Sequence, residues 1–489
     1  MTRVTRIAII GGGPGGYEAA LVAAQLGAEV TVIDSDGIGG SAVLTDCVPS
    51  KTLIATAEVM TGTAESGELG VRLGSGGQGG DLPDDRVGVD LARVNSRVKA
   101  LATAQSQDIT ARLDREGVRV LRGRGRLDGP SRVVAELSAG AAGTAGGTSG
   151  GASGGTATET VEADAVLVAT GAHPRVLPDA VPDGERILTW EQLYDLDHLP
   201  EHLVVVGSGV TGAEFASAYT ALGSRVTLVS SRDRVLPGED ADAATVLEDV
   251  FGRRGMTVLS ASRAGAVTRD GDQVVVALDD GRSLVGSHCL MAVGSIPNTA
   301  GVGLEEAGVR LDSSGYVEVD RVSRTSAAGV YAAGDCTGVL MLASVAAMQG
   351  RIAMWHLLGD AVSPLNLRAV SSNVFTDPEI ATVGWGQKDL DDGSTDAVVV
   401  KLPLATNARA KMQGVHDGFV KLFARPGSGT VVGGVVVAPR ASELIFPVAL
   451  AVEGRLTVDQ LAHSFTIYPS ISGSIAEAAR QLHTQVWQG

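Results

Sequence analysis

Residues 4–34 read VTRIAIIGGGPGGYEAALVAAQLGAEVTVID, and this stretch is the most informative about the fold class. Residues 4–10 are mostly apolar and β-branched and run into glycines, which predicts a buried strand. Residues 17–27 have the spacing of a helix that stops at Gly27, and residues 28–34 predict a second strand. Strand, helix and strand in this order form a βαβ unit, the building block of a doubly wound parallel sheet.

The glycines after the first strand match the pattern G-x-G-x-x-G at Gly11, Gly13 and Gly16. The first glycine of such a pattern permits a tight turn, the second lets the backbone approach a pyrophosphate, and the third lets helix and strand pack closely. Asp34 ends the second predicted strand, 23 residues after Gly11, where a carboxylate can bind a ribose hydroxyl. This context predicts a dinucleotide site rather than a glycine turn without a ligand.

The same pattern returns 196 residues downstream. Residues 202–230 read HLVVVGSGVTGAEFASAYTALGSRVTLVS, with pattern glycines at Gly207, Gly209 and Gly212. Because this distance is too long for a solenoid repeat, we predict two separate Rossmann-like dinucleotide-binding domains.

The second pattern lacks the acidic residue of the first. The position 23 residues after Gly207 is Ser230, and Arg232 and Arg234 follow it. A missing carboxylate removes the repulsion of a 2′-phosphate and arginines can pair with that phosphate, which favours NADPH. The third glycine, Gly212, favours NADH instead, and the two arginines could belong to a solvated loop. We let charge decide and expect NADPH to be used at least as well as NADH.

Other stretches predict the remaining organisation of the chain. Residues 92–116 have helical spacing with exposed charges, whereas residues 74–81 are Gly-rich and residues 139–158 contain only Ala, Gly, Ser and Thr, so we expect surface loops there. After about residue 366, predicted strands (VVVKLPL, GFVKLFAR and TVVGGVVVAP) alternate with predicted helices (ASELIFPVALAVEG and SISGSIAEAARQLH). This pattern indicates a third domain, of α+β type.

The composition excludes several classes of protein. A chain of 489 residues suggests about three domains, and its 44% hydrophobic content excludes a disordered chain. The net charge of −17 disfavours partners such as nucleic acid or anionic lipid. No apolar run reaches the length of about 18 residues that spans a bilayer, and we expect no cleavable signal before the first strand. Three distant cysteines predict no disulfide framework and no metal site. We therefore expect a soluble cytoplasmic protein without stable membrane insertion.

Five further segments carry a family resemblance. They are GIGGSAVLTDCVPSK (37–51), VLVATG (166–171), AVGSIPN (292–298), VYAAGDCTG (330–338) and NARA (407–410). Together with the two glycine patterns, they resemble the pyridine-nucleotide–disulfide oxidoreductase family over essentially the whole chain. The resemblance implies an α/β fold with an FAD-binding domain at 1–165 and 290–365, an NAD(P)H-binding domain at 166–289, and a C-terminal α+β domain at 366–489 that forms a homodimer.

The resemblance also implies roles for individual residues. Cofactors would be bound by Gly11, Gly13, Gly16, Asp34, Cys47, Lys51, Thr170, Gly171, Gly207, Gly209, Gly212, Ser230, Arg232, Arg234, Gly294, Gly334 and Asp335. Lys51 would pair with Glu214 near the flavin N5. A buried structural ion pair would need the same two residues, and the two roles do not exclude each other.

Three elements of the family's dithiol chemistry are missing from this sequence. The family's redox disulfide is C-x-x-x-x-C, but Ala42 occupies the first position and only Cys47 remains, so no intramolecular disulfide can form there. The family's C-terminal His and Glu are replaced by Tyr468 and Gly473. A phenol is a poor thiol base at neutral pH. His463 lies out of register, and we expect it to be a surface or helix-end histidine.

Intact nucleotide sites without a dithiol predict a flavoenzyme whose electrons leave FAD directly. The segments SAVLTDCVPSK and YPSISGSI most resemble the lipoamide-dehydrogenase-like NAD(P)H:quinone reductases of actinobacteria. We therefore expect an FAD-dependent NAD(P)H:quinone oxidoreductase with ping-pong kinetics, in which Lys51 and Glu214 tune the flavin. Tyr468 would either donate a hydrogen bond to the quinone or pack at the dimer interface. The alternatives are a soluble NAD(P) transhydrogenase and a non-enzymatic flavoprotein redox sensor.

Overall fold

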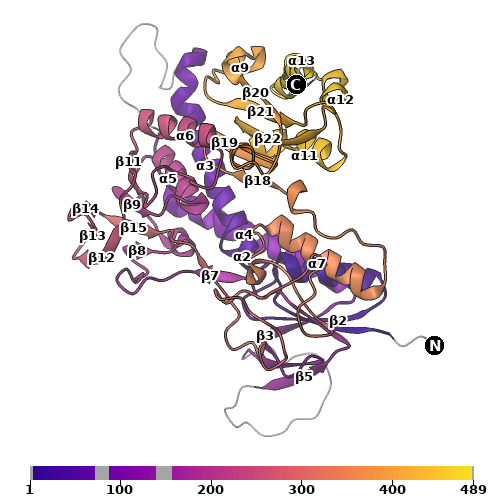
Figure 1. The fold of residues 1–489 in the computed structure, drawn as a ribbon. Helices are drawn as coiled ribbons and strands as arrows, with labels where there is room; N and C mark the ends of the chain where they lie inside the picture. Colours follow the sequence, from indigo (N-terminus) through magenta and orange to yellow (C-terminus); the bar gives the residue numbers. More distant parts are fainter. Residues whose placement is uncertain (1–3, 72–86, 139–156, 487–489) are drawn as a thin grey trace. The chain divides into compact units, whose positions relative to one another are not determined.

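The computed structural model describes residues 4–71, 87–138 and 157–486. The predicted loop at 74–81 lies outside these residues, as does the predicted loop at 139–158 except for its last two residues. Of those two, Thr158 begins a strand. The chain divides into two compact units (Figure 1). Unit 1 comprises Met1–Ser50, Arg97–Arg175 and Gly294–Asn366, and unit 2 comprises Lys51–Ser96, Val176–Val293 and Leu367–Gly489.

Unit 1 is built on a seven-stranded sheet with the order β17-β6-β1-β2-β3-β4-β5. Its strands are β1 (Arg6–Ile10), β2 (Glu29–Asp34), β3 (Arg119–Leu127), β4 (Arg132–Leu137), β5 (Thr158–Glu162), β6 (Ala165–Val168) and β17 (Val330–Ala332). The strands from β17 to β3 run parallel, and β4 and β5 continue the sheet as antiparallel strands. In β1, Ile7 and Ile9 enter one hydrophobic cluster and Ala8 and Ile10 another. Both faces of this strand are therefore buried, as expected for a central parallel strand.

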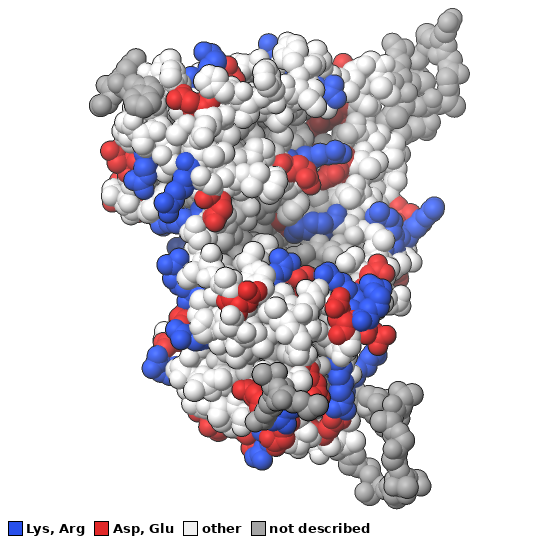
Figure 2. Space-filling view, turned by 90° about the vertical axis from the view of Figure 1, so that its right-hand side faces the viewer, with Lys and Arg blue, Asp and Glu red and all other residues white. Residues whose placement is uncertain are grey.

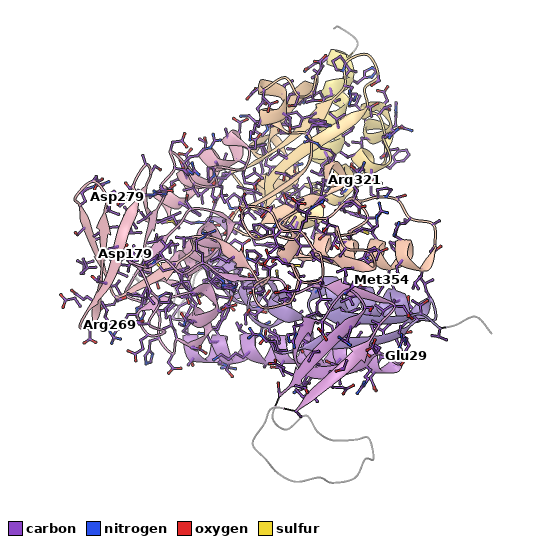
Figure 3. The ribbon with its side chains drawn as sticks, turned by 60° about the horizontal axis from the view of Figure 1, so that its bottom comes forward. Glu29, Asp179, Arg269, Asp279, Arg321 and Met354 are labelled. Atoms are coloured by element: carbon purple, nitrogen blue, oxygen red, sulfur yellow. The ribbon has the colours of Figure 1, made fainter. Side chains whose placement is uncertain are left out.

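Two helices of unit 1 are in close backbone contact. They are α1 (Pro14–Gln25) and α7 (Ala343–Leu358), and a Cβ added at Gly350 would lie 2.1 Å from the carbonyl oxygen of Gly15. Met354 of α7 is fully buried and joins the cluster that contains Ile9 (Figure 3). The other elements that contribute to unit 1 are α2 (Gly40–Leu44), α3 (Cys47–Glu65), α4 (Leu91–Arg115), β7 (Ala172–Pro174), β16 (Ser295–Pro297) and the 3-10 helix Asp335–Thr337.

Unit 2 contains a second, five-stranded parallel sheet with the order β11-β10-β9-β15-β8. Its strands are β8 (Ile187–Leu188), β9 (His202–Val206), β10 (Arg225–Val229), β11 (Thr257–Leu259) and β15 (His288–Met291), and its helices are α5 (Val210–Leu222) and α6 (Ala241–Arg253). An antiparallel meander of β12 (Ala264–Asp270), β13 (Gln273–Leu278) and β14 (Ser283–Gly286) shares the hydrophobic core of this sheet. Figure 3 labels Arg269 and Asp279 at this meander. Both predicted βαβ units are therefore present.

Unit 2 also contains the predicted C-terminal α+β fold, an antiparallel sheet with the order β18-β19-β22-β21-β20. Its strands are β18 (Ser371–Val374), β19 (Glu379–Gly384), β20 (Val398–Pro403), β21 (Phe419–Ala424) and β22 (Val431–Ala438). Its helices are α8 (Gln387–Asp391), α9 (Ala408–Met412), α10 (Ala441–Leu444), α11 (Phe446–Glu453), α12 (Val458–His463) and α13 (Gly473–Val486). The single helix predicted over 441–454 is wrong, because the chain forms α10 and α11 there. Pro447 lies in the first turn of α11, where its missing N–H costs no helical hydrogen bond.

The remaining expectations concern helices and charge. The predicted helix at 92–116 corresponds to α4, whereas the boundaries of the three predicted domains stay a prediction. Within residues 4–71, 87–138 and 157–486, no helix is both long enough and apolar enough to cross a bilayer. On the face drawn in Figure 2, Lys and Arg side chains are interspersed with Asp and Glu side chains.

Candidate active site

The first glycine loop lies in unit 1 between β1 and α1. Gly11 has a φ of +104°, and a Cβ there would lie 2.2 Å from the carbonyl oxygen of Ala169. A Cβ at Gly16 would lie 1.9 Å from the carbonyl oxygen of Gly11. The first and third pattern glycines are therefore required by the close packing of strand and helix. Gly13 is the N-cap of α1, has an extended backbone and provides no capping side chain. The first N–H groups of the helix can therefore bind a phosphate.

Asp34 connects this loop to the end of β2. Its carboxylate accepts hydrogen bonds from the backbone N–H groups of Gly12 at 2.7 Å, Asp36 at 3.0 Å and Gly37 at 2.5 Å. Burial raises the pKa of Asp34, and these three donors act against that rise. The predicted ribose-binding carboxylate thus also connects the glycine loop, through Gly12, to the residues that follow β2, Asp36 and Gly37.

A second turn of unit 1 carries Gly334 and Asp335. The N–H of Gly334 donates to Oε1 of the buried Gln349 at 2.8 Å, and the hydroxyl of Thr337 donates to the carbonyl of Gly334 at 2.7 Å. Burial, together with the nearby carboxylate of Asp46, raises the pKa of Asp335 to about 6. A half-buried carboxyl group of this kind suits a site that a polar ligand fills.

Four strand ends bring the predicted FAD positions of unit 1 to one edge of the sheet. The glycine loop follows β1, Asp34 ends β2, Thr170 and Gly171 follow β6, and Gly334 follows β17. These strands are parallel neighbours, so their carboxyl ends lie at the same edge, where open α/β sheets bind ligands. With its open glycine loop and its carboxylates, this edge fits a dinucleotide such as FAD.

The second glycine loop, in unit 2, repeats the first in detail. Gly207 has a φ of +110°, and its Cβ would lie 2.1 Å from the carbonyl oxygen of Ala292. A Cβ at Gly212 would lie 1.8 Å from the carbonyl oxygen of Gly207. A Cβ at Gly209 would meet nothing within 4 Å, so the start of α5 is open to a pyrophosphate. The predicted cofactor residue Gly294, with a φ of +95°, lies in unit 1.

Ser230 occupies the position that Asp34 has in unit 1, but it is not accessible. It is 0% exposed, and its hydroxyl lies 2.7 Å from the hydroxyl of Ser208 and accepts from the N–H of Arg232 at 3.2 Å. The side chain of Arg232 is exposed and that of Arg234 is half-buried. The structure therefore leaves the two arginines, rather than Ser230, able to meet a ligand directly.

Lys51 and Glu214, which are 163 residues apart, form an ion pair at 2.8 Å. Glu214 is 3% exposed and accepts a second hydrogen bond, from the backbone N–H of Phe375 at 2.9 Å. The Lys51 ammonium lies 4.7 Å from the centre of the Phe375 ring, within cation–π range. Both partners predicted from the sequence are thus together, and Phe375 contacts each of them.

No second thiol lies at the position where the family has its disulfide. Ala42 lies in α2, and Cys47 begins α3. Cys289 and Cys336 are buried, and no disulfide joins any of the three cysteines of the described residues. Burial raises the pKa of Cys336 to about 11, so this thiol stays protonated at neutral pH.

The two candidate groups near the C-terminus are both at the surface. Tyr468 is 85% exposed, with Phe465 and Ile467 also exposed beside it. His463 is exposed at the last residue of α12, as expected. Asn407 of the NARA segment donates to the carbonyl of Ser470 at 3.0 Å, which connects that segment to the loop carrying Tyr468.

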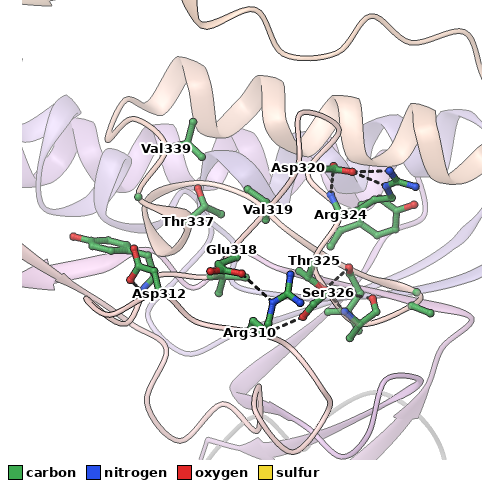
Figure 4. Close-up of a pocket in the computed structure, with 18 residues that line it drawn as sticks. Arg310, Asp312, Glu318, Val319, Asp320, Arg324, Thr325, Ser326, Thr337 and Val339 are labelled. Carbon is green, nitrogen blue, oxygen red and sulfur yellow. Dashed lines mark hydrogen bonds and ion pairs between the residues drawn. The ribbon is translucent and has the colours of Figure 1, made fainter.

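A surface hollow of about 850 Å³ lies elsewhere in unit 1 (Figure 4). Four of the charged side chains along it form two ion pairs, Arg310 with Glu318 at 3.0 Å and Arg324 with Asp320 at 2.7 Å. It contains none of the glycines of either loop. Within the residues 4–71, 87–138 and 157–486, no group of three or more His, Cys, Asp or Glu side chains could hold a metal ion.

Sequence reasoning missed Ser208, Gln349 and Phe375. Ser208 could have been found, because Ser208 and Ser230 have the same separation, 22 residues, as Gly12 and Asp34. Gln349 and Phe375 carry no local signal, since each contacts its partner only through the tertiary fold.

Comparisons with known proteins agree with this arrangement. The sequence profile of the family described as pyridine nucleotide-disulphide oxidoreductase matches residues 5–350, and that of its dimerisation domain matches residues 370–479. The chain is 57% identical to the NAD(P)H dehydrogenase (quinone) of Mycobacterium tuberculosis over 98% of this chain and 94% of that protein. It is 30% identical to the dihydrolipoyl dehydrogenase of Bacillus subtilis over 96% of this chain and 97% of that protein.

A solved structure gives the same result for the fold. The crystal structure of LpdA from Mycobacterium tuberculosis matches with a TM-score of 0.89 and 55% identity, over 98% of this chain and 100% of that one. Members of the matched family are flavoproteins that use FAD and NAD(P)H. The chain therefore belongs to the pyridine nucleotide-disulphide oxidoreductase family.

Proposed function

We propose that the chain is an FAD-dependent NAD(P)H:quinone oxidoreductase that works as a homodimer in the cytoplasm. The observation that carries this proposal is the 57% identity, over 98% of the chain, to a protein named NAD(P)H dehydrogenase (quinone). In the net reaction a hydride from NAD(P)H and a proton from water reduce a quinone to a quinol. Bound FAD would supply the chemistry that separates oxidation of the nicotinamide from reduction of the quinone.

The residues of unit 1 would hold FAD through its phosphates and ribose. The glycine loop leaves the backbone exposed to a pyrophosphate, and Asp34 would bind a ribose hydroxyl. Asp335 would accept a hydrogen bond from the ligand at the neighbouring strand end. In unit 2, the loop at Gly207 would bind the NAD(P)H pyrophosphate, and Arg232 and Arg234 would pair with a 2′-phosphate when NADPH is used.

Lys51 and Glu214 would set the electrostatic environment of the reacting groups. One oxygen of Glu214 binds Lys51 and the other binds the Phe375 N–H, so the carboxylate is satisfied in its buried position. The lysine charge is thereby kept in a defined place. A fixed positive charge stabilises negative charge that develops next to it, and at low cost because no reorganisation is needed.

Ala42 and Cys47 occupy the positions of the family's two redox cysteines, and only one of them carries a thiol. This supports the proposal that electrons are transferred without a dithiol. One thiol cannot cycle between dithiol and disulfide within the chain. Cys47 would instead act as a small apolar wall of the site. Lipoamide and glutathione disulfide, which need a dithiol partner, would therefore not be substrates.

The proposed homodimer rests on the dimerisation domain and on exposed apolar side chains. Phe465, Ile467 and Tyr468, which are close together in the sequence, are 107%, 80% and 85% exposed. Apolar side chains that are exposed as a group mark interaction surfaces. We propose that Tyr468 packs at the subunit interface, where its hydroxyl could also meet a quinone. The three separated cysteines suit the reducing conditions of the cytoplasm.

Anaerobic reduction of the purified holoenzyme tests the function. NADPH should bleach the flavin absorbance. A subsequent addition of menadione should restore it, with one menadione reduced for each reduced flavin that is reoxidised. Addition of NAD⁺ in place of menadione should restore it at a much lower rate. Rapid reoxidation by NAD⁺ with no response to quinones would instead establish a transhydrogenase, and absence of bleaching by NADPH and NADH would leave only a non-enzymatic flavoprotein.

A further inference from the structure

Ser208 joins the second glycine loop to the turn that carries the two arginines. It occupies the second position of the pattern that starts at Gly207. Its hydroxyl lies 2.7 Å from that of Ser230, and its carbonyl accepts from the N–H of Leu236 at 2.9 Å. The two ends of the turn 230–236 are therefore both attached to the same residue of the phosphate-binding loop.

Ser230 organises the inside of this turn. Its hydroxyl lies 3.1 Å from the carbonyl oxygen of Arg232 and 3.2 Å from that of Arg234, and it accepts from the N–H of Arg232. The N–H of Ala261 also donates to the Arg232 carbonyl, at 2.7 Å. The backbone of both arginines is thus directed by one fully buried hydroxyl group.

The arginine side chains are left with unused donors. Arg232 is exposed, and Nε of the half-buried Arg234 is buried without a hydrogen-bond partner among the residues described. Buried polar atoms normally have a partner, and a guanidinium presents donors in the geometry that a phosphate accepts. The turn thus offers donors that a bound anion could satisfy.

We infer that Ser208 and Ser230 determine nicotinamide specificity as positioning residues, by holding Arg232 and Arg234 where they receive the adenosine 2′-phosphate of NADPH. Ser230 has no exposed surface, so it acts through the turn and not by contact with the cofactor. A turn that is ordered before binding loses less conformational entropy when the phosphate arrives. This inference rests on the proposed use of NAD(P)H, but it does not depend on the electron acceptor.

Binding of two probes without a nicotinamide ring tests the inference on the oxidised holoenzyme. The probes are 2′-phospho-ADP-ribose and ADP-ribose, titrated calorimetrically into Ser208→Ala and Ser230→Ala. We expect affinity for the 2′-phosphorylated probe to fall about five- to tenfold, as for loss of one or two hydrogen bonds, and affinity for ADP-ribose to change less than about twofold. The matched control is Ser224→Ala, since Ser224 is also buried but its hydroxyl has no hydrogen-bond partner in the described structure.

Each outcome decides the inference. Equal losses for both probes would show that the serines only support the phosphate-binding loop, and unchanged affinities would show that the turn does not need them. An Arg232→Ala, Arg234→Ala protein that binds the phosphorylated probe as tightly as wild type would also overturn it. If Ser230→Ala fails to fold, Ser208→Ala decides alone. A wild-type protein that shows the expected binding but reduces no quinone would contradict only the proposed function.

Discussion

At the first glycine loop, the backbone N–H of Gly12 donates to the Asp34 carboxylate at 2.7 Å. At the second, the Ser208 hydroxyl meets the Ser230 hydroxyl at 2.7 Å. The surrounding backbone is alike in both, since Gly11 and Gly207 have φ values of +104° and +110°. Each also lies close to the carbonyl oxygen of the residue that follows the neighbouring strand, Ala169 after β6 and Ala292 after β15. The chain thus uses one βαβ framework twice, with a charged connection in unit 1 and a neutral one in unit 2.

The difference suggests two roles for the residue at the end of the second strand, which is Asp34 in β2 and Ser230 directly after β10. We propose that one role is to contact a ribose, and the other is to connect the glycine loop to the segment that follows the strand. A carboxylate performs both roles, because it accepts several N–H groups and still carries a charge. Ser230 performs only the structural role, and we propose that the two arginines take over the ligand-binding role. We therefore expect the two sites to respond differently to equivalent substitutions.

The largest effects are expected at the third glycine of each loop. In Gly16→Ala and Gly212→Ala the new Cβ would lie 1.9 and 1.8 Å from a backbone carbonyl oxygen, so the loop must move. Gly16→Ala should lose affinity for FAD by more than about 100-fold, whereas Gly212→Ala should keep FAD and lose reduction by NAD(P)H. Flavin absorbance per chain and the anaerobic reduction rate measure the two effects.

Gly62→Ala is the control for these variants. Gly62 lies in α3, where an added Cβ would meet nothing within 4 Å, so this change should leave both activities intact and slightly stabilise the helix. If Gly16→Ala and Gly212→Ala lost the same function, the assignment of one cofactor to each loop would be wrong.

A graft should convert the second site into a copy of the first. The double variant Ser208→Gly, Ser230→Asp recreates the pair that Gly12 and Asp34 form. The new carboxylate would repel a 2′-phosphate, so the ratio of kcat/KM for NADPH over NADH should fall about 10- to 100-fold. Ser208→Gly with Ser230→Asn, which adds a side chain without charge, is the control. An unchanged ratio in the charged variant would mean that the 2′ position is not near residue 230.

Asp335 should give a smaller effect, on stability. Its pKa in the folded protein is raised to about 6 by burial, above the usual value near 3.8, so folding takes up a proton in that interval. The favourable contribution of the protonated group is present at low pH and is lost as pH rises through about 6. At pH 7, the free energy of unfolding of Asp335→Asn should therefore exceed that of the wild type by about 1–2 kcal/mol. At pH 4, the two proteins should have nearly the same free energy of unfolding.

Chemical denaturation of the flavin-free proteins at the two pH values measures this difference. The same variant should bind FAD more weakly, because the proposed hydrogen bond to the ligand is weakened. A stability difference that is equal at pH 4 and pH 7 would show that titration of Asp335 is not its cause.

The smallest effect is expected at Cys47, which has no counterpart at the second site. Cys47→Ser should retain FAD and keep menadione turnover within about twofold, because direct transfer needs no sulfur. Lys51→Ala should reduce turnover by about tenfold or more, since it removes a fixed charge and leaves Glu214 buried without its cation. An inactive Cys47→Ser alongside a fully active Lys51→Ala would show that the thiol takes part in the chemistry.

Much of the fold and part of the site follow from local sequence. The two βαβ units, the pattern glycines and the C-terminal sheet are each encoded within short stretches, because side-chain periodicity and glycine conformations act over a few residues. The prediction of a single helix at 441–454 was wrong because a proline near its middle is compatible with two structures. Pro447 can end one helix or begin the next, and the packing of the C-terminal domain decided between them.

Two glycine loops of the dinucleotide-binding pattern, and a single cysteine where the family has two, can be read from the sequence alone, because both are matters of residue identity at fixed spacing. Which side chains meet became known only from the three-dimensional structure. Lys51 reaches Glu214 across 163 residues, Phe375 contacts both, and the hydroxyl of the buried Ser230 meets that of Ser208. Contacts between distant segments depend on how whole elements pack, and no local pattern encodes that packing.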